Sequence, residues 1–137
     1  MTRIPYATKG DTPFQQVLGT CERVMWKWVD LEEDLIHYGR LSVSLKEQVR
    51  RTLAEVNSCE YCKRKGKPDE LHINERQVVA TGFAVVFQQL NGEIPDAVFA
   101  RLQETFTNEE VVELIAWITF ANASQQFGAA VKLGSET

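Results

Sequence analysis

Apolar residues recur at helical spacing along most of the chain, and polar capping residues stand where these segments begin. Thr12-Pro13-Phe14-Gln15 supplies an N-cap, a proline at the first helical position and a glutamine that can reach back to the cap. The apolar residues behind this start predict one helix that extends to about Val29; they are Val17, Leu18, Cys21, Val24, Met25 and Trp28.

A second helix, followed by a short helical turn, is predicted in the middle of the chain. Ser44-Leu45-Lys46-Glu47 has the form of a capping box, and one apolar stripe follows at i, i+4, i+8 and i+11: Leu45, Val49, Leu53 and Val56. Asn57-Ser58 interrupts this stripe, and Ser58 is placed to cap a turn that carries Cys59–Cys62. Gly66-Lys67-Pro68 then ends the turn early.

The second half of the chain contains three further helix starts. Asn74-Glu75-Arg76-Gln77 can cap the apolar run 78–87, whose β-branched residues are also compatible with a buried strand. Its length and the Asn91-Gly92 stop favour a helix. Ile94-Pro95-Asp96 begins the next segment, and Thr107-Asn108-Glu109-Glu110 is another capping box.

The segment behind the last capping box is apolar on more than one face: Val111, Val112, Leu114, Ile115, Trp117, Ile118 and Phe120. Such a helix needs cover on several sides, either from its own core or from another subunit. No segment shows a clean strand alternation. The sequence therefore predicts an all-α fold, a compact bundle of six to seven helices in a single domain, residues 1–137.

Composition narrows the classes of function. The net charge of −4 argues against general nucleic-acid binding and supplies no polybasic membrane anchor. The longest apolar run, VVATGFAVVF, is about half the length that spans a bilayer, and the N-terminal segment lacks the apolar core of a signal peptide. We therefore expect no membrane partner and a cytoplasmic location, where thiols are kept reduced.

In that compartment a Cys-x-x-Cys pair such as Cys59 and Cys62 is typical of metal binding or catalysis. A structural zinc needs four ligands, yet beyond the pair the chain offers only Cys21, His37 and His72, none at matching spacing. We therefore expect no metal and no cofactor. Cys21 lies on the apolar stripe of the first helix, where an inert buried thiol is expected.

The surroundings of the pair favour redox chemistry. If a turn begins at Ser58, Cys59 lies at a helix N-terminus, where free N–H groups and the helix dipole stabilise a thiolate. Cys62 lies one turn further along, close enough to form a disulfide. The basic run Lys63-Arg64-Lys65 adds positive charge, although it is equally compatible with a solvated turn.

The stretch LKEQVRRTLAEVNSCEYC resembles the signature of the carboxymuconolactone decarboxylase superfamily, in its alkylhydroperoxidase D-like branch. There a helix that begins with a glutamate ends in a short break and precedes a Cys-x-x-Cys helix. Glu47 stands twelve residues before Cys59, which matches the family spacing. The resemblance continues through ERQVVATGFAVV and EIPDAVFARLQETFTNEEVVELIAWITFANASQQFGAAV, so the motif-bearing part is about 45–133.

This resemblance implies an alkylhydroperoxidase D-like bundle that assembles as a homo-oligomer, a trimer or a hexamer. It also implies a thiol-dependent, peroxidase-type antioxidant oxidoreductase. Cys62 would attack the peroxide, Cys59 would resolve the sulfenic acid as a disulfide, an external dithiol would reduce the disulfide, and Glu47 would belong to a proton relay. The helix-start argument favours Cys59 as the attacking thiol, so the order of the two cysteines stays open.

The sequence departs from the family pattern at Gly66, where relatives carry a histidine four residues after the second cysteine. Three explanations remain. The basic residues and the helix end could maintain the thiolate; His72 or His37 could enter the site from elsewhere; or the peroxidase activity is weak or lost and the pair serves another redox purpose.

Some roles and two other functions stay open. Glu47 is equally compatible with a capping role, and Tyr61 could line the pocket, although such a tyrosine usually packs with its hydroxyl at the rim. The family's ring-compound decarboxylases suggest a lyase acting on a small ring acid, but those members act without the cysteine pair. A non-catalytic oligomeric module with remnant thiols is the third interpretation.

Overall fold

The computed structural model describes residues 1–69 and 74–134. Within these ranges all regular structure is helical, which confirms the predicted all-α fold. In chain order the elements are α1 (Pro13–Leu18), the 3-10 turn η1 (Gly19–Cys21), α2 (Glu22–His37), α3 (Val43–Val56), α4 (Glu60–Arg64), α5 (Glu75–Leu90), α6 (Asp96–Thr105) and α7 (Asn108–Ala130).

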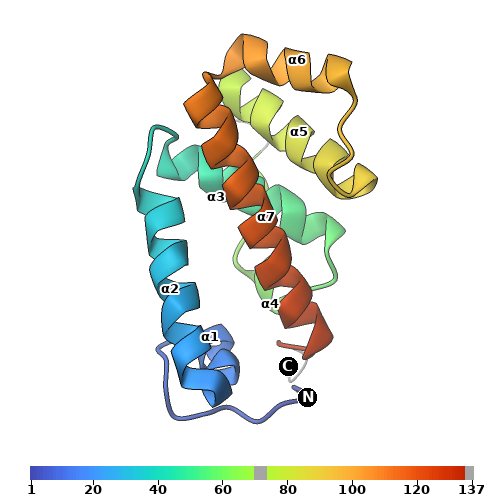
Figure 1. The fold of residues 1–137 in the computed structure, drawn as a ribbon. Helices are drawn as coiled ribbons and strands as arrows, with labels where there is room; N and C mark the ends of the chain where they lie inside the picture. The colour runs from blue at the N-terminus through green and yellow to red at the C-terminus, as the bar shows by residue number, and fades with distance from the viewer. Residues whose placement is uncertain (70–73, 135–137) are drawn as a thin grey trace.

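The long helix α7 runs through the middle of the bundle (Figure 1). It packs against α2, α3, α4 and α6, and α3 packs in turn against α5. The core lies among α3, α5 and α7, where burial of large apolar side chains provides most of the stabilisation; it includes Val49, Leu53, Phe83, Leu114 and Ile118. Helices of the same chain thus cover most of α7, although Val112 remains 68% exposed.

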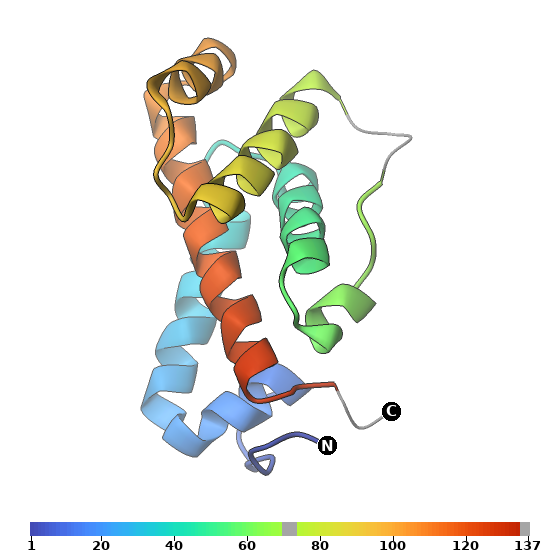
Figure 2. The ribbon, with the colours of Figure 1, turned by 90° about the vertical axis from the view of Figure 1, so that its right-hand side faces the viewer.

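The two ends of the described chain meet at one end of the bundle (Figure 2). The backbone N–H of Arg3 donates to the carbonyl of Val131, just beyond α7, at 2.8 Å. The short helices α1 and α4 lie at this same end, beside the last turns of α7 (Figures 1 and 2). This arrangement brings segments from both halves of the sequence around the cysteine pair.

Several predicted helix boundaries are confirmed. Asn74 caps α5 through a capping box with Gln77, and Asn91 ends the same helix in the left-handed conformation at φ 53°. The β-branched run is therefore helical. Thr107 and Glu110 form the predicted capping box at the start of α7.

The prediction of one long first helix was wrong. Thr12 caps α1 as expected, but the chain leaves helical geometry at Gly19–Cys21 before α2 begins. At Gly19 the main chain approaches the carbonyl oxygen of Lys9 so closely that a Cβ would lie 2.8 Å from it. The apolar stripe is thus shared by two helices, and Cys21 is an exposed free thiol rather than a buried one.

Two predicted caps were also placed incorrectly. Ser42, not Ser44, caps α3, and the Ser44 hydroxyl instead accepts a hydrogen bond from Gln77. The short helix α4 begins at Glu60, and its N-cap is Cys59 itself rather than Ser58. The early end of this helix is as predicted, because it stops at Arg64, two residues before the positive-φ glycine.

Candidate active site

Cys59 and Cys62 form a disulfide across the first turn of α4, with their Cα atoms 5.2 Å apart. Because Cys59 is the N-cap, its sulfur also accepts a hydrogen bond from the backbone N–H of Cys62 at 3.2 Å. The structure thus brings together the two cysteines that the sequence singled out.

The two sulfurs differ in access. Cys59 is completely buried, whereas Cys62 is 7% exposed and lines a pocket. The cover over Cys59 comes from α7, where a Cβ at Gly128 would lie 2.5 Å from the Cys59 sulfur. A side chain at position 128 would therefore collide with the disulfide, a constraint that sequence spacing did not indicate.

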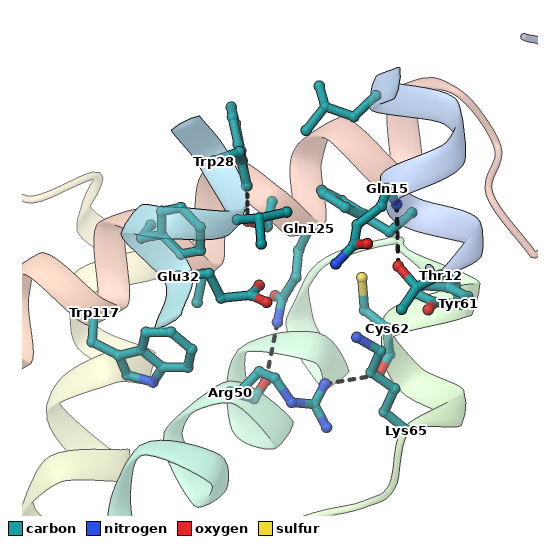
Figure 3. A pocket seen from close by; sticks show the side chains of 16 residues that line it. Thr12, Gln15, Trp28, Glu32, Arg50, Tyr61, Cys62, Lys65, Trp117 and Gln125 are labelled. Atoms are coloured by element: carbon teal, nitrogen blue, oxygen red, sulfur yellow. Dashed lines mark hydrogen bonds between the residues drawn. The ribbon is translucent and has the colours of Figure 1, made fainter. Parts of the chain in front are cut away.

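The pocket beside Cys62 has a volume of about 690 Å³, including the part open to solvent. Its apolar wall comes from α1, α2 and α7: Phe14, Leu18, Trp28, Trp117, Phe120 and Ala121. Its polar side includes Glu32, Arg50, Tyr61, Lys65 and Gln125. Figure 3 shows the Cys62 sulfur pointing into this space. Such an apolar cavity with a few converging polar groups is typical of a small-molecule site.

The break between α3 and α4 is held by a buried amide network. The side-chain NH₂ of Asn57 donates to Asn122 at 3.0 Å and to Gln125 at 2.6 Å, and its carbonyl oxygen accepts from Gln88 at 2.8 Å. Gln125 in turn donates to the backbone carbonyl of Arg50 at 3.0 Å. The network fixes the chain two residues before Cys59 to both α5 and α7.

Glu47 is bound by arginines rather than by the cysteine pair. Its carboxylate accepts hydrogen bonds from Arg50 at 2.7 and 2.9 Å and from Arg51 at 3.0 Å. Burial alone would raise the pKa of Glu47, but the bonds and charges of Arg50 and Arg51 outweigh it and lower that pKa. Arg50 also donates to the backbone carbonyl of Cys62 at 3.1 Å, so Glu47 connects to Cys62 through Arg50.

Of the other residues named from the sequence, Tyr61 lies at the pocket and His37 does not. Tyr61 lines the pocket, and the Lys65 ammonium lies 4.9 Å from the centroid of its ring. His37 pairs with Glu33 at 3.6 Å on the outer side of α2 and is not among the pocket residues. His72 lies outside the described residues. Within the described ranges, no cluster of three or more potential metal ligands is found.

Gly66, at the position of the family histidine, adopts φ +128°, a conformation that side-chain-bearing residues rarely take. A Cβ there would lie 3.1 Å from the guanidinium carbon of Arg51. The local backbone therefore disfavours a histidine at this position.

Sequence reasoning missed Glu32, which lines the pocket with Cys62 and Lys65. Burial raises the pKa of Glu32, against the opposing positive charges of Lys65 and Arg50. Burial lowers the pKa of Lys65, helped by Arg50. Trp28, Glu32 and Ile36 follow one another at helical spacing, so the sequence places a carboxylate within an apolar stripe. This pattern could have indicated a partly buried carboxylate at Glu32.

Comparisons with known proteins support the fold. No family model matches the sequence, and no curated protein matches it significantly. Among solved structures, the chain is similar to an uncharacterized peroxidase-related protein from Silicibacter sp. TM1040, with a TM-score of 0.71 and 18% identity. The match covers 81% of this chain and 69% of the other. At this identity the likeness shows a shared all-helical fold.

Proposed function

We propose that the protein is a thiol oxidoreductase that reduces a peroxide. The observation that carries this proposal is the Cys59–Cys62 disulfide with Cys62 in the wall of an apolar pocket. The similar structure from Silicibacter is named a peroxidase-related protein, which agrees with this chemistry.

The reaction balances with the two cysteines and one peroxide. The Cys62 thiolate attacks one oxygen of the O–O bond, the bond breaks, and the other oxygen leaves as an alkoxide that is protonated to an alcohol. Cys62 becomes a sulfenic acid. The Cys59 thiol then condenses with it, water leaves, and the disulfide forms. An external dithiol, of the kind that a reducing cytoplasm supplies, must return the pair to its reduced form.

Burial favours Cys62 as the attacking thiol. Its sulfur faces the pocket, whereas the Cys59 sulfur is enclosed beneath Gly128. The capping position argues the other way, because the Cys62 N–H that the Cys59 sulfur accepts would stabilise a Cys59 thiolate. We give burial the greater weight, since an enclosed Cys59 sulfur is placed to resolve its neighbour rather than to meet a substrate.

The test is mass spectrometry of the reduced protein after stoichiometric hydrogen peroxide or an organic hydroperoxide. We expect a Cys59–Cys62 disulfide in the wild type. Cys62→Ser should abolish turnover, and Cys59→Ser should accumulate a sulfenic acid on Cys62, trapped by dimedone. A wild-type protein that forms no disulfide would refute the proposal, and a double Cys→Ser variant active on a lactone acid would indicate a lyase.

We also propose that residues 1–137 form one domain that assembles with copies of itself, as a trimer or a hexamer. The exposed Val112 on α7 and Leu31 on α2 support such an assembly. Light scattering coupled to size-exclusion chromatography tests it, and a monomer at micromolar concentration would contradict it.

Within the described ranges, no helix is long and apolar enough to cross a membrane.

A further inference from the structure

Peroxide reduction at Cys62 needs a group that accepts the thiol proton and a group that protonates the leaving alkoxide. The position of the family histidine is occupied by Gly66, whose backbone conformation disfavours a side chain. Glu47 is held by two arginines and has no hydrogen bond to the cysteine pair among the described residues. Neither of these two positions therefore supplies a proton carrier for Cys62.

Resting on the proposed function, we propose that Glu32 of α2 is this catalytic residue, and that its carboxylate carries one proton from the Cys62 thiol to the leaving alkoxide. Glu32, from α2, and Cys62, from α4, line the same cavity although they lie far apart in the sequence. In Figure 3 the Glu32 carboxylate and the Cys62 sulfur both point into the cavity, from α2 and α4. A substrate bound between them would contact both groups.

The state of the Glu32 side chain supports this role. None of the hydrogen bonds or ion pairs found for the described residues engages its carboxylate, in contrast to the carboxylate of Glu47. Its pKa is raised by burial, which brings it toward the pH at which a general base works best. An unengaged carboxylate in a partly apolar pocket can exchange protons with a bound molecule.

The charged groups around Glu32 come from three helices. Arg50 of α3 and Lys65 at the end of α4 face it with positive charge, and Glu33 is its negative neighbour on α2. Tyr61 also lines the cavity and has its own pKa raised by burial. Lys65 and Arg50 would stabilise the Cys62 thiolate and the departing oxyanion while Glu32 holds the proton.

The proton balance closes without another co-reactant. The Glu32 carboxylate takes the proton of the Cys62 thiol, which gives a carboxylic acid and a thiolate. The thiolate attacks the peroxide, the O–O bond breaks and an alkoxide leaves. The Glu32 acid then protonates this alkoxide to an alcohol and returns to a carboxylate. No net proton is gained or lost at Glu32 in this half-reaction.

The experiment is the pH dependence of disulfide formation in the full chain after rapid mixing with cumene hydroperoxide. In the wild type, the rate should rise as the pH passes through the raised pKa of Glu32, above its ordinary value of 4.5. In Glu32→Gln this limb should vanish, and the rise should move toward the unperturbed thiol pKa of about 8.5. Near neutral pH the rate should fall about 10²-fold, the lower end for general acid–base catalysis.

Two variants distinguish chemistry from structure. Glu33→Gln removes the same charge one residue away, on the exposed side of α2. Because the charge of Glu33 helps to raise the pKa of Glu32, this variant should move the limb to lower pH but keep both the limb and the plateau rate. Glu32→Asp retains a shorter carboxylate and should restore part of the limb. If Glu32→Gln keeps the wild-type limb and rate, the role of Glu32 is refuted while peroxide reduction stands. If the wild type itself forms no disulfide, both proposals fail.

Discussion

The amide network at Asn57 gives the sharpest prediction on stability, because one buried side chain joins three helices. Asn57 lies at the end of α3, and its amide group bonds to Asn122 and Gln125 of α7 and to Gln88 of α5. We predict that Asn57→Ala lowers the free energy of unfolding more than the loss of any single one of these bonds.

The magnitude follows from the bond count. Three hydrogen bonds at a net value of about 0.5–1.5 kcal/mol each give about 1.5–4.5 kcal/mol. The upper half of this range applies, because the variant leaves the side-chain oxygens of Gln125, which is only 2% exposed, and of Asn122 without the Asn57 donor. We therefore expect a loss of about 3–4 kcal/mol. At roughly 3–5 °C per kcal/mol for a chain of this size, the melting temperature should fall by about 9–20 °C.

The assay is urea unfolding followed by circular dichroism, performed on both the oxidised and the reduced protein. Gln88→Ala is the matched control, since it removes one bond of the same network and should cost about 1 kcal/mol. If Asn57→Ala costs no more than Gln88→Ala, the network does not stabilise the break between α3 and α4, and the reasoning from buried polar satisfaction is refuted.

Three further predictions test the surroundings of the site. Gly66→His should fail to accelerate peroxide reduction and should cost about 1–3 kcal/mol in urea unfolding because of its positive φ; faster turnover would contradict this. Gly128→Ala should cost about 1–3 kcal/mol, because its Cβ would overlap the sulfur of Cys59, and the cost should shrink in a Cys59→Ala background; an equal cost in both would exclude that contact. Burial raises the pKa of Glu113, but its bond to Lys46, two backbone N–H groups and the Lys46 charge outweigh it and lower that pKa. The stabilisation that ionised Glu113 provides should therefore be complete above its ordinary pKa of 4.5 and should be lost as the pH falls through the lower pKa of the folded state. The urea midpoint should then depend less on pH in Glu113→Gln than in the wild type over this acid range. An unchanged dependence of the midpoint on pH would refute this.

The helix starts at Asn74 and Thr107 could be predicted because a capping box is a contact between residues three apart. The break at Gly19–Cys21 could not, since the apolar spacing runs through it without interruption. The close approach of Lys9, which leaves no room for a side chain at Gly19, depends on how the preceding segment folds back. Local contacts were thus predictable at these two starts, although the same kind of local argument misplaced the caps at Ser44 and Ser58.

The candidate site likewise contains residues that the sequence could identify and residues that it could not. Cys59 and Cys62 could be identified because two cysteines separated by only three positions can form a disulfide within one helical turn. Glu32 could not be placed near them, because it lies 30 residues before Cys62 and reaches the pocket only when α2 packs against α7. Spacing alone also could not rank the two thiols, since the burial of Cys59 comes from Gly128 on a distant helix.

The two carboxylates near Cys62 differ in the way that distinct roles require. Glu47 is fixed by two arginines that lower its pKa, so it stays an anion and holds Arg50 against the Cys62 carbonyl. Glu32 has its pKa raised by burial and no such partner, so it is the carboxylate able to change protonation state during a reaction. Environments that push two pKa values apart are how one site obtains both a fixed charge and a proton carrier. On this argument the loss of a histidine at Gly66 does not by itself remove acid–base chemistry, because that chemistry requires a titratable group facing the thiol rather than a particular residue on α4.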